Sequence, residues 1–277
     1  MSDKPGPKWP WILLAAVFLI TAASIAFDKY KARQGPPDPL PSEVKPWFGP
    51  RNQLELEQAA QVAVDGARAR LATSPDEWLR QEVLARALVR RFRAIGSYED
   101  LAEADGLLDK GMAGAPFPAG PSLSRAEVSV LAHRLEAADK GLERFFAQVG
   151  EPDDGESAGA WSLKGDIAFQ RGDMKAARLA FTRAEEYDNN AAVALRQSML
   201  ALRTGDPDLA RRRINAVLRA PKLSRYVKSQ VSLQRVTIAY GTGDWKAAGE
   251  WARFADGFFP GNPLAMAHVA QHKALAQ

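Results

Sequence analysis

The sequence contains no cysteine, so it can form no disulfide, no thiolate metal site and no covalent intermediate on a cysteine nucleophile. It has only three histidines, and it shows no phosphate-binding loop, nucleophile elbow or dinucleotide-binding fingerprint. We therefore expect no enzyme, no catalytic residue and no bound cofactor. The lack of thiols also suits a protein exported from the cytoplasm.

Net positive charge is scarce once the first residues are set aside. The formal net charge is +4, and residues 1–33 hold five Lys or Arg against two Asp. The rest of the chain is therefore close to neutral, and we expect no nucleic acid partner.

A long apolar run stands near the start of the chain. It extends from Trp9 to Phe27, WPWILLAAVFLITAASIAF, and contains 19 residues. As a helix it would be ~28 Å long, close to the thickness of a bilayer core. After a short tail at 1–8, we expect a single transmembrane anchor over residues 9–27. The alternative is a cleaved signal sequence, since the small residues near Ser24 suit a cleavage site.

The basic residues around this run do not decide which side of a membrane the rest of the chain occupies. Lys4 and Lys8 precede the run, and Lys29, Lys31 and Arg33 follow it. The short basic N-terminus and the absence of cysteine favour a periplasmic or extracytoplasmic domain, with the cytoplasm as the alternative.

Six prolines occur in the stretch 34–50, within a predicted linker over residues 28–50. Proline blocks helix and sheet and favours an extended chain, which at ~3 Å per residue could span ~50 Å. We expect Trp47 and Phe48 to dock on the domain that follows, residues 51–277.

The clearest local pattern lies within residues 160–190. Two helical stretches are separated by Gly172 and Asp173, a C-terminal glycine followed by an N-cap aspartate, as in a helical hairpin. Gly165 on the first helix and Ala177 on the second are small, so we expect the two helices to cross closely there.

Turns of this kind recur along the chain. Their turn residues are Gly96, His133, Gly172, Gly205 and Gly243, at steps of 37, 39, 33 and 38 residues. Histidine tolerates a positive backbone φ better than most residues other than glycine, so we expect His133 to take the glycine conformation. The spacing predicts five helical hairpins that stack into one continuous array.

The hairpin within residues 160–190 resembles a tetratricopeptide repeat. The residues at the family positions are Trp161, Gly165, Gly172, Ala177, Phe181 and Ala184, and the departures are Lys164, Ala168 and Asn189. The resemblance is specific over residues 158–260. It implies an all-α, right-handed superhelical solenoid of about five hairpins, preceded by the single transmembrane helix and ended by a capping helix at 263–277 with a polar outer face.

In this family the first helices of the hairpins line a concave groove that binds peptides or helices. The candidate groove residues that the resemblance implies here are Ser162, Asp166, Phe169, Leu195, Met199 and Leu202. The last three would give the groove an apolar stretch suited to an amphipathic helix. The alternative is that these three residues only pack between repeats.

A second candidate surface is a basic stripe within residues 209–240, which contain eight Lys or Arg and no acid. Its candidate residues are Arg211, Arg212, Arg213, Arg219, Lys222, Arg225 and Lys228. Such a stripe would suit an acidic peptide, an anionic lipid headgroup or another subunit. The alternatives are an ordinary solvated helix face and a contact with the acidic residues within 151–156 of the same chain.

His268 and His272 are four residues apart, so they share one helix face and could hold a metal ion. The zinc-protease motif needs Glu directly after the first histidine, where this chain has Val269. We therefore expect no metal site.

Together these features predict a non-enzymatic, membrane-anchored scaffold or adaptor that holds protein partners. The resemblance to anchored bacterial repeat proteins implies envelope assembly, protein secretion or cytochrome maturation as its setting. One alternative is a self-associating structural membrane protein. Another is a metal-binding protein or enzyme that uses His268 and His272.

Overall fold

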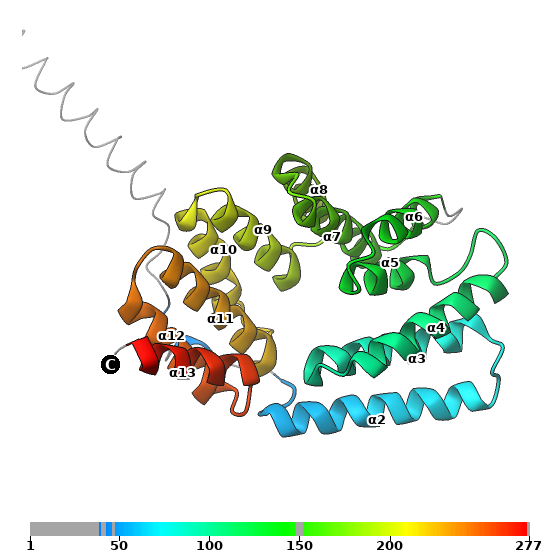
Figure 1. Ribbon diagram of the computed structural model, residues 1–277, viewed down its shortest axis with the longest axis horizontal. Coiled ribbons are helices and arrows are strands. Elements are labelled where there is room, and N and C mark those ends of the chain that lie inside the picture. The colour runs from blue at the N-terminus through cyan, green and yellow to red at the C-terminus, as the bar shows by residue number, and fades with distance from the viewer. Residues whose placement is uncertain (1–38, 40–42, 46–47, 148–151, 276–277) are drawn as a thin grey trace, which may run out of the picture. The chain divides into compact units, whose positions relative to one another are not determined.

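The computed structural model describes residues 39, 43–45, 48–147 and 152–275, all within one compact unit, Pro39–Gln277. These residues form 12 helices, α2 to α13, and no strand (Figure 1). The predicted tail and anchor, residues 1–27, lie outside the described residues. Among the residues that are described, no helix combines the length and the apolar character that crossing a membrane requires.

Ten of the helices pair into five hairpins, which confirms the predicted all-helical repeat array. The pairs are α3 (Trp78–Ile95) with α4 (Tyr98–Gly114), α5 (Ser122–Leu131) with α6 (Leu135–Phe146), α7 (Asp154–Gln170) with α8 (Met174–Tyr187), α9 (Ala191–Arg203) with α10 (Pro207–Arg219), and α11 (Arg225–Gly241) with α12 (Trp245–Phe258). A further helix, α2 (Gln53–Ala72), precedes the first pair, and α13 (Pro263–Leu275) follows the last.

The turn residues adopt the conformation that the sequence predicts. Gly172 has φ +82° and Gly243 has φ +76°, and His133 takes the same left-handed region with φ 56°. The residue after Gly172 is Asp173, whose side chain accepts a hydrogen bond from the backbone N–H of Ala176 at 2.9 Å and so caps α8. Each turn therefore ends one helix and begins the next within three residues.

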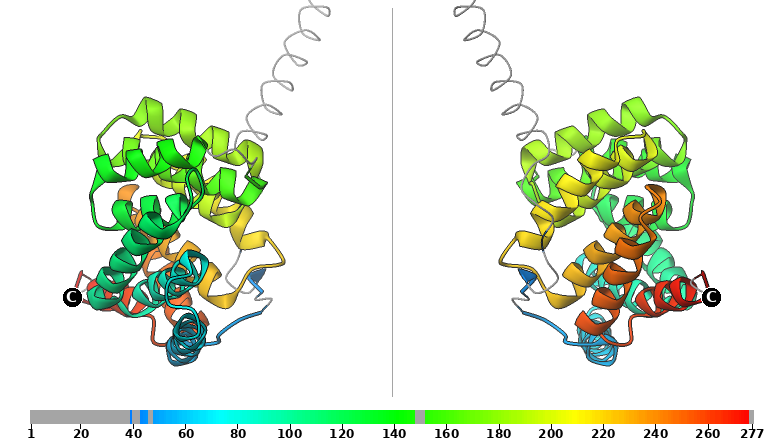
Figure 2. Two further views of the ribbon diagram at one scale, coloured as in Figure 1. Left: turned by 90° about the vertical axis from the view of Figure 1, so that its right-hand side faces the viewer. Right: turned by 90° about the vertical axis from the view of Figure 1, so that its left-hand side faces the viewer.

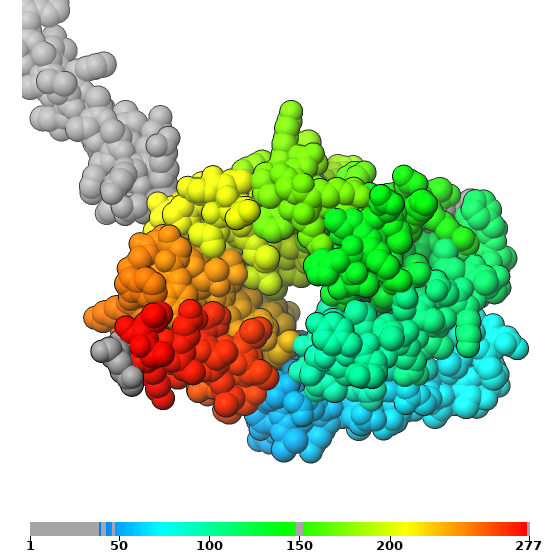
Figure 3. Space-filling view, viewed as in Figure 1, coloured from blue at the N-terminus to red at the C-terminus, as the bar shows by residue number. Residues whose placement is uncertain are grey.

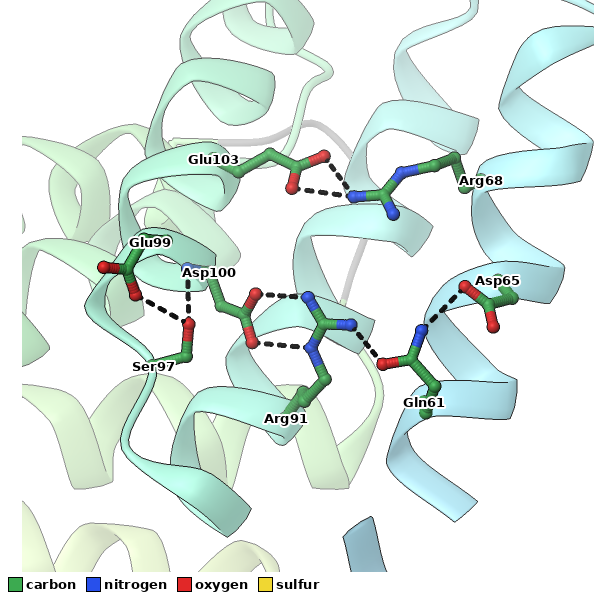
Figure 4. Close-up of polar contacts among 8 residues, drawn as sticks. All are labelled: Gln61, Asp65, Arg68, Arg91, Ser97, Glu99, Asp100 and Glu103. Atoms are coloured by element: carbon green, nitrogen blue, oxygen red, sulfur yellow. Dashed lines mark hydrogen bonds and ion pairs between the residues drawn. The ribbon is translucent and has the colours of Figure 1, made fainter. Parts of the chain in front are cut away.

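A network of polar side chains joins α2, α3 and α4 at the start of the array (Figure 4). The carboxylate of Asp100 on α4 accepts from both Nε and Nη2 of Arg91 on α3, and the Nε contact measures 2.7 Å. Nη1 of Arg91 donates to Oε1 of Gln61 on α2 at 2.6 Å, and Gln61 donates onward to Asp65. Because Asp100 is only 2% exposed, its pair with Arg91 belongs to the interior between α3 and α4, whereas Gln61 and Asp65 extend the network to the exposed surface of α2.

The proline-containing segment before α2 does not stand free where it is described. Val44 is 4% exposed and belongs to the apolar core of α9 to α13. The ammonium of Lys228 on α11 donates to the backbone carbonyl of Lys45 at 2.5 Å. Where it is described, this segment therefore packs on the last hairpins, which offer an apolar site and a buried donor. Of the two aromatics expected to dock, Phe48 is 59% exposed, and Trp47 lies outside the described residues.

The first helix of the array also contacts the end of the last hairpin. The backbone N–H of Gln53 donates to the carbonyl of Pro260 at 3.0 Å, and its side-chain amide donates to the carbonyl of Ala94 at 2.6 Å. In both views of Figure 2 the blue start of α2 accordingly lies close to the red C-terminal helices. The space-filling view shows an opening between the orange and teal surfaces of this unit (Figure 3).

The last helix, α13, packs on α12 of the final hairpin. Gln271 and Lys273 are exposed, as expected for a capping helix, but Leu264 and Leu275 are also exposed, at 57% and 59%. The prediction of a polar outer face is therefore wrong in part, since apolar side chains share that surface.

Candidate functional site

Three successive first helices, α7, α9 and α11, line a hollow of about 360 Å³. Its lining residues are Phe169, Met199, Leu202, Arg203, Gln234 and Thr237. First helices supply all of these residues, as in the concave groove that the repeat resemblance implies. We call this hollow the groove site.

The floor of the groove site consists of the apolar residues that the sequence singled out. Met199 is 43% exposed, so its thioether side chain is available for contact. Leu202 lines the hollow and also packs against the core of α9 to α13, and Leu195 belongs to that core contact alone. Leu202 therefore fits both the groove interpretation and the packing interpretation, whereas Leu195 fits only packing between repeats.

An ion pair holds α7 and α9 next to the groove site. Nε of Arg196 donates to both carboxylate oxygens of Asp166 at 2.9 Å, and its Nη2 lies 2.8 Å from Oδ2. The planar guanidinium fits a carboxylate in this two-point arrangement, which fixes the relative position of the two helices. Ser162 is 4% exposed and lies in the interior. Of the three α7 candidates, Phe169 alone lines the hollow.

The polar rim of the groove site was not anticipated. Arg203, Gln234 and Thr237 offer a cation, an amide and a hydroxyl beside an apolar floor. Thr237 stands six residues before its turn glycine, as Met199 does in the preceding hairpin. Counting residues back from each turn glycine could therefore have identified Thr237 from the sequence.

The side chains of the basic stripe are divided among different environments. Arg213 forms an ion pair with Glu185 of α8, and Arg211 pairs with Asp208 at 2.5 Å within α10. The pKa of Glu185 lies below its ordinary value: burial alone would raise it, but hydrogen bonds from Gln197 and Arg213 and the charge of Arg213 outweigh that effect.

The remaining stripe residues also differ in exposure. The guanidinium of Arg225 donates to the carbonyl of Phe258 at 3.1 Å and lies over its ring. Lys228 is 2% exposed, and burial lowers its pKa. Exposed positions are Arg219 and Lys222, and Arg212 is half-buried. These contacts leave the stripe without a single continuous charged face. Asp153, from the acidic segment considered as its partner, caps α7 through the N–H of Glu156.

The three histidines occupy structural positions. Nδ1 of His133 lies 3.0 Å from Oε1 of Gln170, and the ring of His268 lies 6.1 Å from that of Tyr240. His272 lies directly over Gly249 of α12, where even a Cβ would come within 2.2 Å of its Nε2. Within the described ranges no group of three His, Cys, Asp or Glu side chains could hold a metal ion.

Comparison with known proteins relates the chain to others by fold. It matches no protein-family model and no curated protein sequence. One chain of the APC/C hetero-tetramer Cut9–Hcn1 superimposes with a TM-score of 0.59 at 10% identity, over 80% of this chain and 40% of that one. This chain therefore spans less than half the length of that relative.

Two further solved structures are similar at lower scores. Yeast Tom70 gives a TM-score of 0.49 at 14% identity, over 82% of this chain and 54% of that one. YrrB, described as a TPR protein with an unusual peptide-binding site, gives 0.42 at 16% identity, over 74% and 98%. The chain thus has the helical solenoid fold of tetratricopeptide-repeat proteins, the class that its turns and hairpins define.

Proposed function

We propose that the protein is a non-enzymatic scaffold that binds a partner protein in the groove site. The observation that carries this proposal is the hollow formed by Phe169, Met199 and Leu202 on three successive first helices. A partly exposed apolar floor with a polar rim is the usual composition of a peptide-binding surface. The fold shared with tetratricopeptide-repeat proteins, among them a peptide-binding one, agrees with this use.

The composition of the rim defines the partner further. Arg203 is exposed and forms no ion pair with any described residue, so its charge is available to a carboxylate. Met199 and Leu202 would take an apolar side chain beside that carboxylate. The partner segment is therefore an amphipathic peptide or helix with an apolar residue next to an acid.

The setting that we propose is a membrane surface. The apolar run at residues 9–27 would anchor the chain, and the soluble unit would lie on the periplasmic or extracytoplasmic side. Envelope assembly, protein secretion and cytochrome maturation are the processes in which such an anchored scaffold would serve. Because the chain has no cysteine, single-cysteine variants at exposed Val62 would report which side is accessible to an impermeant thiol reagent.

The experiment that tests the groove site is site-specific photocrosslinking in native membranes. A benzophenone amino acid replaces exposed Thr237 in the full chain, and the same crosslinker at exposed Val62 on α2 is the control position. We expect one specific protein adduct from the Thr237 position, lost when Met199→Glu is added, since a carboxylate would face the apolar residue of the partner.

A second comparison separates this site from the basic stripe. The double change Arg211→Glu with Arg212→Glu should leave the adduct intact if the groove site binds the partner. Loss of the adduct with this variant, but not with Met199→Glu, would contradict the proposal and favour the stripe. An adduct with a second copy of the chain would favour the self-associating alternative.

A further inference from the structure

A second hollow, of about 390 Å³, lies on the second helices α6 and α8 and on the α7 side chains between them. Its lining includes Trp161, Lys164, Ala168, Ala176, Leu179 and Ala180, together with the ion pair of Asp139 and Arg171 and the α8 cap Asp173. It shares no lining residue with the groove site, which first helices alone form. We call it the outer hollow.

The repeats show what normally fills this position. Lys164 stands eight residues before the turn glycine of its hairpin, and Ala180 stands eight after it. In the last hairpin the same two positions are Arg235 and Trp251, and the guanidinium lies 5.3 Å from the centre of the indole ring. Trp251 is 6% exposed, so a bulky aromatic side chain of the protein itself closes that place.

In the α9/α10 hairpin a carboxylate of the preceding hairpin bonds the residues at these two positions. There the two residues are Gln197 and Arg213, and both bond to the carboxylate of Glu185 on the preceding second helix, with Gln197 at 2.8 Å. In the hairpin before the outer hollow, Arg125 is the first of the two, and it pairs with Asp109 of α4 at 2.8 Å. A cationic or amide group on the first helix thus meets either a carboxylate or an aromatic ring in these three hairpins.

In the α7/α8 hairpin the cation meets aromatic rings but no carboxylate of a described residue, and the second position carries no bulky side chain. The ammonium of Lys164 lies 5.0 Å from the ring centre of Trp161 and 5.9 Å from that of Phe146, and among the described residues no carboxylate pairs with it. Ala180 supplies a methyl group where Trp251 supplies an indole. Leu179, which lines the hollow, is 65% exposed, so an apolar wall borders the space.

We propose that the outer hollow is a docking site for a partner segment that carries an aromatic side chain beside a carboxylate. The aromatic ring takes the place that Trp251 fills in the last hairpin, against Ala168, Ala176 and Ala180. The carboxylate pairs with Lys164, as Asp109 pairs with Arg125. Large aromatic residues that enter such pockets supply much of the binding free energy at protein interfaces. This site is separate from the groove site, so the protein can hold two segments at once.

The test uses a short acidic peptide with one aromatic residue, acetyl-Glu-Trp-Glu-amide, and the full chain carrying ¹³C-labelled alanine methyl groups. We expect saturable shifts of the methyl signals of Ala168, Ala176 and Ala180. The peptide acetyl-Glu-Ala-Glu-amide should bind at least about tenfold more weakly, since it lacks the ring.

Two variants and a control decide the outcome. Ala180→Trp should abolish the shifts by filling the hollow as Trp251 does, and Ala267→Trp at an exposed site on α13 should leave them unchanged. Leu179→Glu, at a 65% exposed position where the new carboxylate is solvated, should weaken binding at least about tenfold even if Ala180→Trp fails to fold.

The opposite results would overturn the site. Equal shifts in wild type and Leu179→Glu, equal binding of the two peptides, or no saturable shift at millimolar peptide would each do so. Met199→Glu should not affect these shifts, so failure of the groove site and failure of the outer hollow give different results.

Discussion

Gly165 and Phe181 meet where α7 and α8 cross, at a distance that leaves no room for a side chain at position 165. A Cβ there would lie 2.3 Å from Cε1 of Phe181, whose ring is 2% exposed and cannot move aside. We expect Gly165→Ala to lower the free energy of unfolding by about 1 to 3 kcal/mol, because overpacking outweighs the helix propensity of alanine. Urea unfolding measures this change.

The matched control is Gly106→Ala, because a Cβ at that exposed position in α4 would meet no atom within 4 Å. It should raise stability by up to about 1 kcal/mol. The change Ala177→Leu, at a fully buried position of the same crossing, should destabilise by about 1 to 3 kcal/mol. A neutral effect of both Gly165→Ala and Ala177→Leu would contradict the close crossing.

The buried ion pair of Arg91 and Asp100 makes a stronger prediction. Asp100→Asn leaves the Arg91 guanidinium, 16% exposed, without its counter-charge, so we expect a loss of about 3 kcal/mol. Glu103→Gln, which breaks the exposed pair with Arg68 in the same part of Figure 4, should cost less than about 1 kcal/mol. Similar losses from the two variants would show that burial does not distinguish the pairs.

The carboxylate of Asp105 predicts a dependence on pH. Burial alone would raise its pKa, but the hydrogen bond from Arg134 and the charges of Arg125 and Arg134 hold it below the ordinary 3.8. A lowered pKa in the folded state stabilises the fold above the ordinary value, and this contribution is lost as the pH falls through the folded pKa. Wild type should therefore lose more stability than Asp105→Asn between about pH 6 and pH 3. Parallel slopes in thermal unfolding would exclude this role.

His133 occupies a turn position where the other four hairpins have glycine, with φ 56°. A β-branched residue is strained in this region, whereas glycine is not, so His133→Gly should be more stable than His133→Val by about 1 to 2 kcal/mol. Thermal unfolding of the pair gives the difference directly. Equal stabilities would mean that the turn relaxes out of the left-handed conformation in the valine variant.

The sequence was sufficient for the hairpins and much less so for contacts between them. Gly172 and Asp173 determine a helix end and a helix start through their own backbone and side chain, so the pattern is local and can be counted along the chain. Phe169, Met199 and Leu202 were found because the resemblance to a tetratricopeptide repeat, which rests on the same local pattern, places them on first helices that line a groove.

The contacts that were missed join residues far apart in the chain. Lys45 and Lys228 are separated by 183 positions, and no local pattern indicates that one supplies the carbonyl that the other needs. Whether Arg213 faces solvent depends on Glu185 in the preceding hairpin, which the run of basic residues around it does not reveal. The sequence therefore suggested one basic surface, although some of these side chains form ion pairs and Lys228 is buried.

The docking of Val44 gives a last prediction. Its side chain is 4% exposed in the core of α9 to α13, so Val44→Ala removes two buried methyl groups and should lower the free energy of unfolding by about 1 to 2 kcal/mol. Val62→Ala is the matched control, since Val62 is 71% exposed on α2 and should change stability by less than about 0.5 kcal/mol.

Amide hydrogen exchange shows where the change occurs. The start of α11 around Lys228 should exchange faster in Val44→Ala, with α3 and α4 unaffected, because only the last hairpins lose a contact. Equal exchange and equal stability in the two valine variants would mean that this segment lies on the last hairpins without stabilising them.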